Sequence, residues 1–305
     1  MKRRKFIKEI TIGSGLLMTG GFPLHAALDD RQITKITILH TNDFHSRIDP
    51  FPMDGSRNAG MGGAAKKAAL IKKIREEETH VYLFDSGDIF QGTPYFNFYG
   101  GELEIKLMSE MKYDAATIGN HDFDAGIDGF LKQLPHANFP FICSNYAFDD
   151  TPLHDKIISY KIFNRGGVKL GVFGLGIELA GLVPKVLFGN THYQDPIQIA
   201  EKTAHFLKNE AKCDYVICLS HLGYQYKNDK ISDVRLATET TNINLILGGH
   251  THTFMEKAEV LKNKIGEPVI INQAGWAGIM LGRLDLYFEK NKKSRCETCE
   301  NLWVS

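Results

Sequence analysis

The sequence Ile33-Thr-Lys-Ile-Thr-Ile-Leu-His-Thr-Asn-Asp-Phe-His45 runs from an apolar strand pattern into two polar side chains, Asp43 and His45. β-branched residues lie on both faces of the run 33–39, a pattern typical of a strand buried on both sides. On an extended backbone, residues i and i+2 point the same way, so Asp43 and His45 can face one small volume. The stretch therefore predicts a buried strand that ends in a polar cluster.

Strand-like and helix-like segments alternate along the rest of the chain. Helices are predicted at 64–77 and 103–111, and from Pro196, a residue suited to the first helical turn, to about 211. The apolar side of the first helix is expected to consist of Ala65, Ala68, Ala69, Ile71 and Ile74. Apolar runs predict the other strands, at 81–84, 115–118, 139–143, 168–175, 215–219, 243–247 and 269–271. This alternation favours an α/β architecture in which helices cover sheets. We expect one domain over residues 30–290 and a charged C-terminal tail over residues 291–305.

Four further polar clusters each follow an apolar run. They are Asp85-Ser-Gly-Asp88, Gly119-Asn-His-Asp-Phe-Asp124, Ser220-His221 and Gly248-Gly-His-Thr-His252. Each cluster alone could be a turn or a structural polar pair. All five in this order predict one site, because strand ends in α/β sheets converge on a single crevice. Oxygen and imidazole donors without thiolates suit manganese, iron, zinc or a similar divalent ion.

The N-terminus has the layout of a secretory signal peptide over residues 1–27. A basic stretch, Met1-Lys-Arg-Arg-Lys-Phe-Ile-Lys8, precedes an apolar run at 10–22 and small residues at Ala26-Ala27. The pair Arg3-Arg4 resembles the twin-arginine export signal, and a generic secretory signal is the alternative. We expect export to the periplasm by the twin-arginine route. No later run of 18 apolar residues exists, so no stable membrane span is expected in the mature protein.

Composition and cysteine usage narrow the possible classes. The 305 residues carry no net charge with histidine neutral, so no electrostatic footprint for a nucleic acid is expected. Five cysteines are an odd number, which argues against a complete disulfide framework. Cys296 and Cys299 cannot close a four-ligand zinc site by themselves. A local disulfide between them is favoured if the compartment is oxidising.

The ordered motifs resemble the signature of calcineurin-like metallophosphoesterases: Asp-x-His, Gly-Asp, Gly-Asn-His-[Asp/Glu], a single His and Gly-His-x-His. The resemblance to the 5′-nucleotidase branch is closer and covers about residues 34–288. It rests on the segments 39–45, 62–66, 87–94, 117–124, 219–224 and 246–253. It implies a four-layer α/β/β/α sandwich of two mixed sheets. Ser46 departs from the pattern, because the family usually has glycine there.

The resemblance also implies two divalent metal ions and a role for each polar residue. One metal would be held by Asp43, His45 and His252. The other would be held by Asn120, His221 and His250. Asp88 would bridge both ions, and His121, oriented by Asp124, would be the catalytic histidine and general acid.

The expected function is therefore an exported phosphomonoesterase acting on nucleoside 5′-phosphates or related nucleotides. A phosphodiesterase, a UDP-sugar hydrolase, a sulfur-ester hydrolase of the same branch and a non-catalytic exported scaffold are the alternatives. Full-length 5′-nucleotidases of this branch carry a second, C-terminal domain that contacts the nucleotide. From its absence in this sequence we expect that a separate polypeptide carries that domain.

Overall fold

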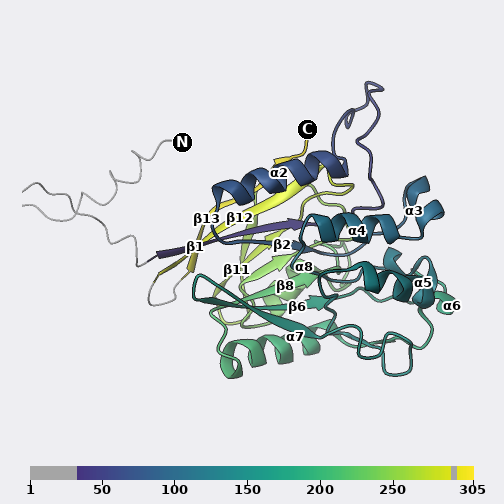
Figure 1. Cartoon of the computed structure of the whole chain (residues 1–305). Helices are drawn as coiled ribbons and strands as arrows, with labels where there is room; N and C mark the ends of the chain where they lie inside the picture. The colour runs from purple at the N-terminus through teal and green to yellow at the C-terminus, as the bar shows by residue number, and fades with distance from the viewer. Residues whose placement is uncertain (1–32, 290–293) are drawn as a thin grey trace, which may run out of the picture. The chain divides into compact units, whose positions relative to one another are not determined.

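The computed structural model describes residues 33–289 and 294–305 (Figure 1). The predicted signal peptide, residues 1–27, lies outside the described residues, and so do residues 290–293 at the start of the predicted tail. Within the described ranges, no helix has the length and apolar character needed to cross a bilayer.

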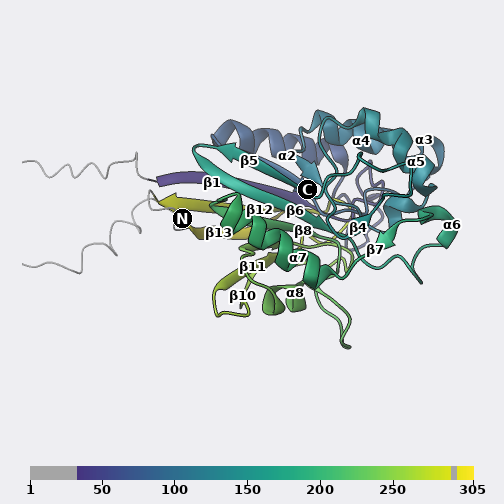
Figure 2. The same cartoon turned by 90° about the horizontal axis from the view of Figure 1, so that it is seen from below.

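Two mixed sheets lie at the centre of the described domain (Figures 1 and 2). The first has the order β13-β12-β1-β2-β3, with bounds Ser294–Trp303, Met280–Glu289, Ile33–Thr41, Val81–Asp85 and Ala115–Ala116. The second has the order β10-β11-β9-β8-β6-β5, with bounds Glu259–Lys262, Pro268–Asn272, Leu245–Leu247, Tyr215–Ser220, Val168–Leu175 and Tyr160–Arg165. In each sheet the inner strands that lead into the polar clusters run parallel. A two-stranded sheet pairs β4 (Tyr146–Ala147) with β7 (His192–Tyr193).

Helices cover the outer faces of both sheets. Apolar residues of α2, α4 and α5 pack on the first sheet, and those of α7 and α8 pack on the second. The helices are α2 (Ala64–Glu77), α3 (Pro94–Tyr99), α4 (Glu102–Glu110), α5 (Gly126–Gln133), α6 (Lys185–Phe188), α7 (Pro196–His205) and α8 (Asp233–Glu239). In Figures 1 and 2, α2 and α7 lie on opposite sides of the strands. The predicted four-layer α/β/β/α sandwich is therefore confirmed.

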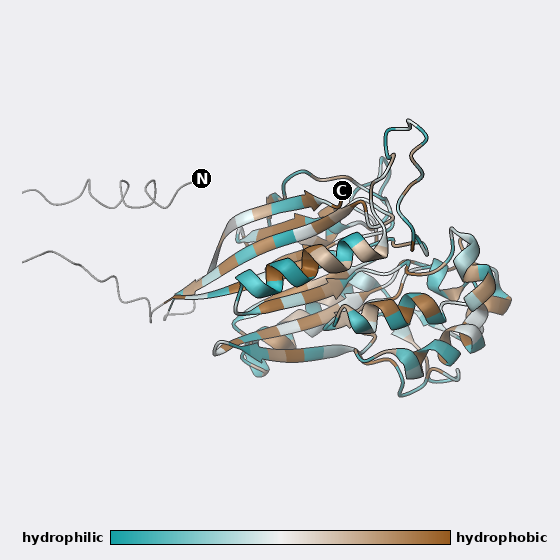
Figure 3. Cartoon of the chain, turned by 45° about the horizontal axis from the view of Figure 1, so that its top comes forward, coloured by the Kyte–Doolittle hydropathy of each residue, from teal (hydrophilic) through white to brown (hydrophobic). Residues whose placement is uncertain are grey.

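Alternation along β1 serves two apolar cores. Ile36 and Ile38 face the core between the sheets, whereas Leu39 packs with the helices on the outer side. This is the period of two that a pleated strand imposes. Figure 3 shows the resulting concentration of apolar residues along the strands, and alternating polar and apolar residues along α2.

The buried face of α2 differs from the predicted one. The alanine-rich pattern favoured Ala65 and Ala69 as buried residues, but both are exposed and Lys67 is buried instead, one turn before Ile71. The Lys67 ammonium lies 3.6 Å from the centroid of the Phe44 ring, a favourable cation–π position. Burial lowers the pKa of Lys67 to about 8, and the negative charge of Asp85 opposes that shift. The attraction of the Lys67 ammonium to the Phe44 ring and to the Asp85 carboxylate therefore outweighs the apolar pattern that predicted a different buried face.

Two further predicted elements differ in detail. The helix from Pro196 ends as an α-helix at His205 and continues as a π-helical turn over Phe206–Glu210. The strand predicted at 139–143 forms only isolated bridges, such as that between Phe141 and Ala116. The predicted helix at 103–111 is confirmed as α4 with bounds one residue earlier.

The segment predicted as a charged tail is instead an edge strand. β13 pairs antiparallel with β12 over its whole length, and Val304 beyond it is buried. A bulge in β13 shifts the register opposite Asp285 and Leu286 by one residue. This shift turns Cys296 and Cys299, three positions apart, to the same face, because they pair opposite Leu286 and Leu284. The two cysteines form a disulfide.

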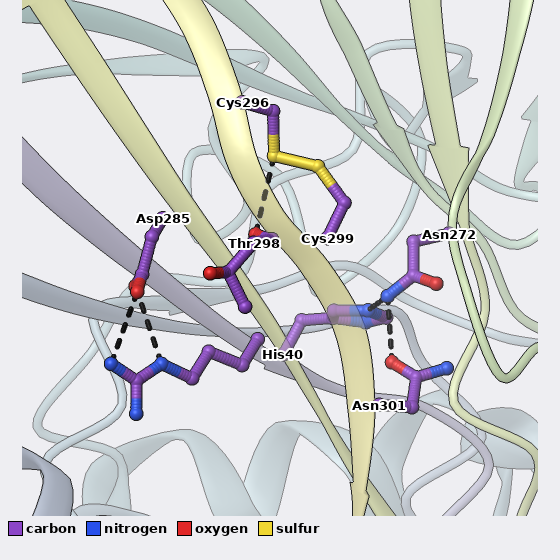
Figure 4. The surroundings of a disulfide bond; sticks show 8 residues. His40, Asn272, Asp285, Cys296, Thr298, Cys299 and Asn301 are labelled. Atoms are coloured by element: carbon purple, nitrogen blue, oxygen red, sulfur yellow. Dashed lines mark hydrogen bonds and ion pairs between the residues drawn. A yellow bond between two sulfur atoms is a disulfide. The ribbon is translucent and has the colours of Figure 1, made fainter. Parts of the chain in front are cut away.

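A buried polar network joins β13 to the second sheet near that disulfide (Figure 4). The Asn301 side chain accepts a hydrogen bond from Asn272 Nδ2 at 2.7 Å and donates to the Gln273 carbonyl at 2.8 Å. Asn272 Nδ2 also lies 2.7 Å from His40 Nε2, on β1. One asparagine of the last strand therefore connects both sheets where the polar loops begin.

We predict that Asn301→Ala lowers the free energy of unfolding by about 1–3 kcal/mol, because it removes the buried hydrogen bonds that Asn301 makes with the Asn272 side chain and with backbone carbonyls. Urea unfolding at neutral pH measures the change. Glu300→Ala is the matched control, since Glu300 is the exposed neighbour on the same strand. Equal effects of the two substitutions would show that the network adds nothing to stability.

Candidate metal centre

Five loops at one end of the sandwich carry the predicted polar residues. Three follow β1, β2 and β3 of the first sheet, and two follow β8 and β9 of the second. The first two loops are joined by backbone hydrogen bonds, from Asp43 N to Gly87 O at 2.9 Å and from His45 N to Asp88 O at 3.1 Å. Both sheets therefore contribute donors to one place, as the strand-end argument predicted.

The first donor group consists of Asp43, His45 and His252. His45 Nε2 and His252 Nε2 lie 3.0 Å apart, and His252 Nε2 is 3.2 Å from Asp43 Oδ1. The Asp43 carboxylate is fully buried and also accepts from the backbone N–H of His250. Two imidazole nitrogens and one carboxylate oxygen therefore converge on a common point.

The second donor group consists of Asp88, His221 and His250. His221 Nε2 is 3.0 Å from Asp88 Oδ2, and Asn120 Oδ1 is 2.9 Å from His250 Nδ1. Asp88 Oδ2 is also 3.9 Å from His45 Nε2 of the first group. Asp88 thus lies between the two groups, close to a histidine of each.

These donors fit two divalent metal ions. His221 Nε2 is completely buried and makes no hydrogen bond, since its approach to Asp88 lacks hydrogen-bond alignment. A buried imidazole nitrogen that lies 3.0 Å from a carboxylate oxygen without a hydrogen bond is an arrangement that a bound cation satisfies. The other ring nitrogen of His221 donates to the Ser86 carbonyl at 2.6 Å, which fixes the ring and leaves Nε2 as the donor atom.

The electrostatics of the pocket also favour a cation. Burial alone would raise the pKa of Asp88, but the charges of His221 and His45 hold it well below its usual value. Burial lowers the pKa of His250 to about 4 and also lowers that of His45. The His250 ring therefore stays neutral at pH 7 and keeps a lone pair for a metal ion. The Asp88 carboxylate raises the pKa of His221 to about 10 against the effect of burial, so a cation bound there would have to displace the proton of that ring.

Five of the seven donor residues are held in a backbone conformation that favours glycine. The φ angles are 49° at Asp43, 49° at His45, 55° at Asp88, 70° at His250 and 51° at His252. A left-handed non-glycine residue costs on the order of 1–3 kcal/mol and persists only where its surroundings hold it. Gly119 shows how close the loops come, because a Cβ atom there would lie 2.2 Å from Asp88 Oδ1.

The buried carboxylate of Asp122 holds these loops together, although no role was predicted for it from the sequence. Asp122 accepts hydrogen bonds from the backbone N–H groups of Asp88, Ile89 and Gly119 at 3.1, 2.8 and 2.7 Å. Burial and the negative charge of Asp88 raise the pKa of Asp122 to about 7. Its place directly after His121, inside a motif already singled out, was the available signal.

Two amides outside the predicted site set also position donors. Asn42 Nδ2 donates to Asp43 Oδ2 at 2.6 Å and to the Gly275 carbonyl at 2.6 Å. Gln273 Nε2 donates to the Gly249 carbonyl at 2.7 Å, and its oxygen accepts from the Thr253 N–H. Gln273 therefore forms hydrogen bonds with both ends of the loop that carries His250 and His252. No sequence pattern marked Gln273, because it lies far from the clusters along the chain.

His121 and Asp124 form a pair at the edge of the donor groups. His121 Nδ1 is 2.8 Å from Asp124 Oδ2, and the hydrogen bond to Asp124 raises the pKa of His121. The His121 side chain is 38% exposed, and its ring centroid lies 5.2 Å from that of His45. The His121 N–H donates to Asp88 Oδ1 at 2.8 Å. The imidazole is thus held beside the donors, and within the described residues no hydrogen bond involves its Nε2.

Comparison with known proteins identifies the family to which the chain belongs. The family model for calcineurin-like phosphoesterases matches residues 36–254. A snake venom 5'-nucleotidase from Gloydius brevicauda is 32% identical over 279 residues, which cover 84% of this chain and 45% of that protein. A 5'-nucleotidase from Bos taurus is 31% identical and is covered to 47%. The chain thus spans less than half the length of these curated relatives.

Solved structures share the fold. A 5'-nucleotidase precursor from Thermus thermophilus superposes with a TM-score of 0.79 at 28% identity, covering 88% of this chain and 54% of that one. The NAD nucleotidase of Haemophilus influenzae gives a TM-score of 0.78 at 25% identity, covering 89% and 56%. The family match spans every residue of the two donor groups and the His121–Asp124 pair. The chain therefore belongs to the calcineurin-like phosphoesterase family, a family of phosphoester hydrolases.

Proposed function

We propose that the chain is an exported phosphomonoesterase that acts on nucleoside 5′-phosphates or related nucleotides with two divalent metal ions. The observation that carries the proposal is the position of Asp88. Its carboxylate lies within 3.9 Å of both His45 and His221, so two donor groups share one oxygen ligand beside His121. That arrangement suits a phosphoryl group held across two cations.

Each set of residues has a distinct task in this proposal. Asp43, His45 and His252 would hold one ion, Asn120, His221 and His250 would hold the other, and Asp88 would serve both. When bound, divalent ions supply Lewis-acid activation of the ester and of water. His121 donates a proton from Nε2 to the departing oxygen. Asp124 accepts the Nδ1 hydrogen and raises the pKa of His121, which favours the doubly protonated ring that carries this second proton. The left-handed loops keep the donors in place before substrate arrives, so little reorganisation is needed.

The substrate class rests on the relatives, two of which are named as 5'-nucleotidases. A phosphate-release screen of the metal-loaded chain with 5′-nucleotides, cyclic nucleotides, UDP-sugars and an aryl phosphate tests it. We expect the highest kcat/KM with a 5′-nucleotide. Preference for a cyclic nucleotide or UDP-sugar would reassign the substrate, and release from no ester would contradict hydrolysis altogether. The separate polypeptide expected from the sequence stays a prediction.

The separation of metal-binding from proton-donating roles can be tested by two substitutions. We predict that Asp88→Ala loses metal and activity together, because one carboxylate serves both ions. His121→Ala should keep about two ions per chain, yet kcat/KM should fall by about 10²-fold or more, as expected for a lost general acid. Elemental analysis and phosphate release measure the two quantities.

His154→Ala is the matched control for His121→Ala. His154 lies beside Asp155 at 3.2 Å on the surface, so it repeats the histidine–aspartate pair away from the donors. It should change neither metal content nor rate. If His121→Ala stripped an ion while Asp88→Ala retained both, the two roles would have to be exchanged.

Export is proposed from the N-terminal sequence pattern. We predict that replacing Arg3 and Arg4 together by lysine retains the protein in the cytoplasm, since the twin-arginine route reads that pair. Cell fractionation followed by immunoblotting measures the distribution. Replacing Lys5 and Lys8 by arginine keeps the charge and serves as the control. Unchanged export of the Arg3, Arg4 double variant would point to a generic secretory signal.

A further inference from the structure

His252 is the least protected histidine of the first donor group. Its side chain is 39% exposed, whereas those of His45 and His221 are 9% and 0% exposed. His221 is oriented by the Ser86 carbonyl through its second ring nitrogen. Within the described part of the chain, no hydrogen bond reaches Nδ1 of His252. The plane of this ring is therefore not set by a hydrogen bond at Nδ1, as it is in His221.

The indole of Trp276 occupies the face of His252. The two rings are stacked with centroids 5.4 Å apart and planes 4° from parallel. This offset stacking is a favoured arrangement of aromatic rings. It leaves the ring edge free, so that His252 Nε2 points at Asp43 Oδ1 and His45 Nε2, at 3.2 and 3.0 Å.

The Trp276 backbone is tied to both loops of the first donor group. Ala277 N donates to the Asp43 carbonyl at 2.7 Å, and Gly275 N donates to the Thr253 carbonyl at 3.0 Å. Gly275 and Ala277 have φ angles of 68° and 56°, so the indole projects from a tight turn. Movement of Trp276 is therefore linked to the loops that carry Asp43 and His252.

A second aromatic residue holds Trp276 itself. Phe51 meets it edge-to-face with centroids 5.8 Å apart, and the Arg47 guanidinium lies 4.3 Å from the Phe51 centroid. Phe51, Met61 and Trp276 pack on a small buried cluster that includes Ala277 and Ile279. The indole is thus packed by its neighbours and presents a fixed surface to His252.

We propose that Trp276 is a positioning residue that holds His252 in its metal-binding orientation. It thereby sets the metal affinity of the Asp43–His45–His252 group and leaves that of the Asp88–His221–His250 group unchanged. This inference rests on the metal-binding part of the proposed function and not on the substrate. Partners that orient a ligating histidine typically change metal affinity about 10–100-fold when they are removed.

The experiment is a manganese titration of the apo protein against a competing fluorescent chelator, which resolves the two binding steps. Trp276→Ala should weaken one step about 10-fold and leave the other as in the wild type. Trp276→Phe keeps an aromatic face and should restore most of the affinity. Trp303→Phe is the control, because Trp303 is the only other tryptophan and stacks on Phe254 instead of on a donor.

If Trp276 acts through His252, the effects on metal affinity of substituting Trp276 and His252 should not be additive. His252→Ala should weaken the same step, and Trp276→Ala added to it should weaken that step no further. An additive loss, an equal loss at both steps, or wild-type affinity in Trp276→Ala would overturn the proposal. So would a wild-type chain that binds no manganese. A chain that binds two ions but hydrolyses no ester would contradict the proposed function and leave this inference standing.

Discussion

The in-register parallel pairing of β1 with β2 determines where the donors lie. Thr41 lies opposite Asp85, and the ladder continues beyond the strands as hydrogen bonds from Asp43 and His45 to the loop of Asp88. A slip by one residue would turn every side chain to the other face of the sheet. Ile36 and Ile38 prevent that slip, since it would move them out of the core between the sheets. The position of Asp88 between the two donor groups therefore depends on apolar residues that lie well away from it.

The sequence allowed prediction of those features that depend on local order along the chain. Apolar runs followed by polar clusters located most of the strands and brought all nine candidate residues to one end of the sandwich. Asp43 and His45 do converge, but on a left-handed backbone and not on the extended one that the i, i+2 argument assumed. Their left-handed φ angles of 49° were not predictable, because these are imposed by contacts with the loop after β2. The metal-binding and catalytic roles of the nine residues stay predictions.

Features that depend on distant contacts escaped prediction for a common reason. Lys67 is buried because Phe44 and Asp85 lie beneath α2, and nothing within the helix indicates this. β13 looked like a charged tail because an edge strand can carry polar residues and its pairing partner is known only from the fold. Gln273 and Trp276 gain their importance from loops that are adjacent in space. The local order of residues predicts a strand or a turn, but it does not predict which segment will pair with that strand in a sheet.

Buried carboxyl groups around the donors link the site to the stability of the fold. Burial raises the pKa values of Asp85, Asp122 and Asp233 to about 6, about 7 and about 8. Groups with such raised pKa values are partly protonated at neutral pH, so in the metal-free chain protonation, together with the charges of Lys67 and His221, limits the repulsion among them. Bound divalent cations stabilise such a cluster, because they are the largest local charges in a site of this kind. We therefore expect metal binding to stabilise the folded chain as well as to supply chemistry. The sandwich fold thus holds the strained loops and the buried carboxyl groups close together, and bound cations would offset the electrostatic repulsion between the ionised carboxylates.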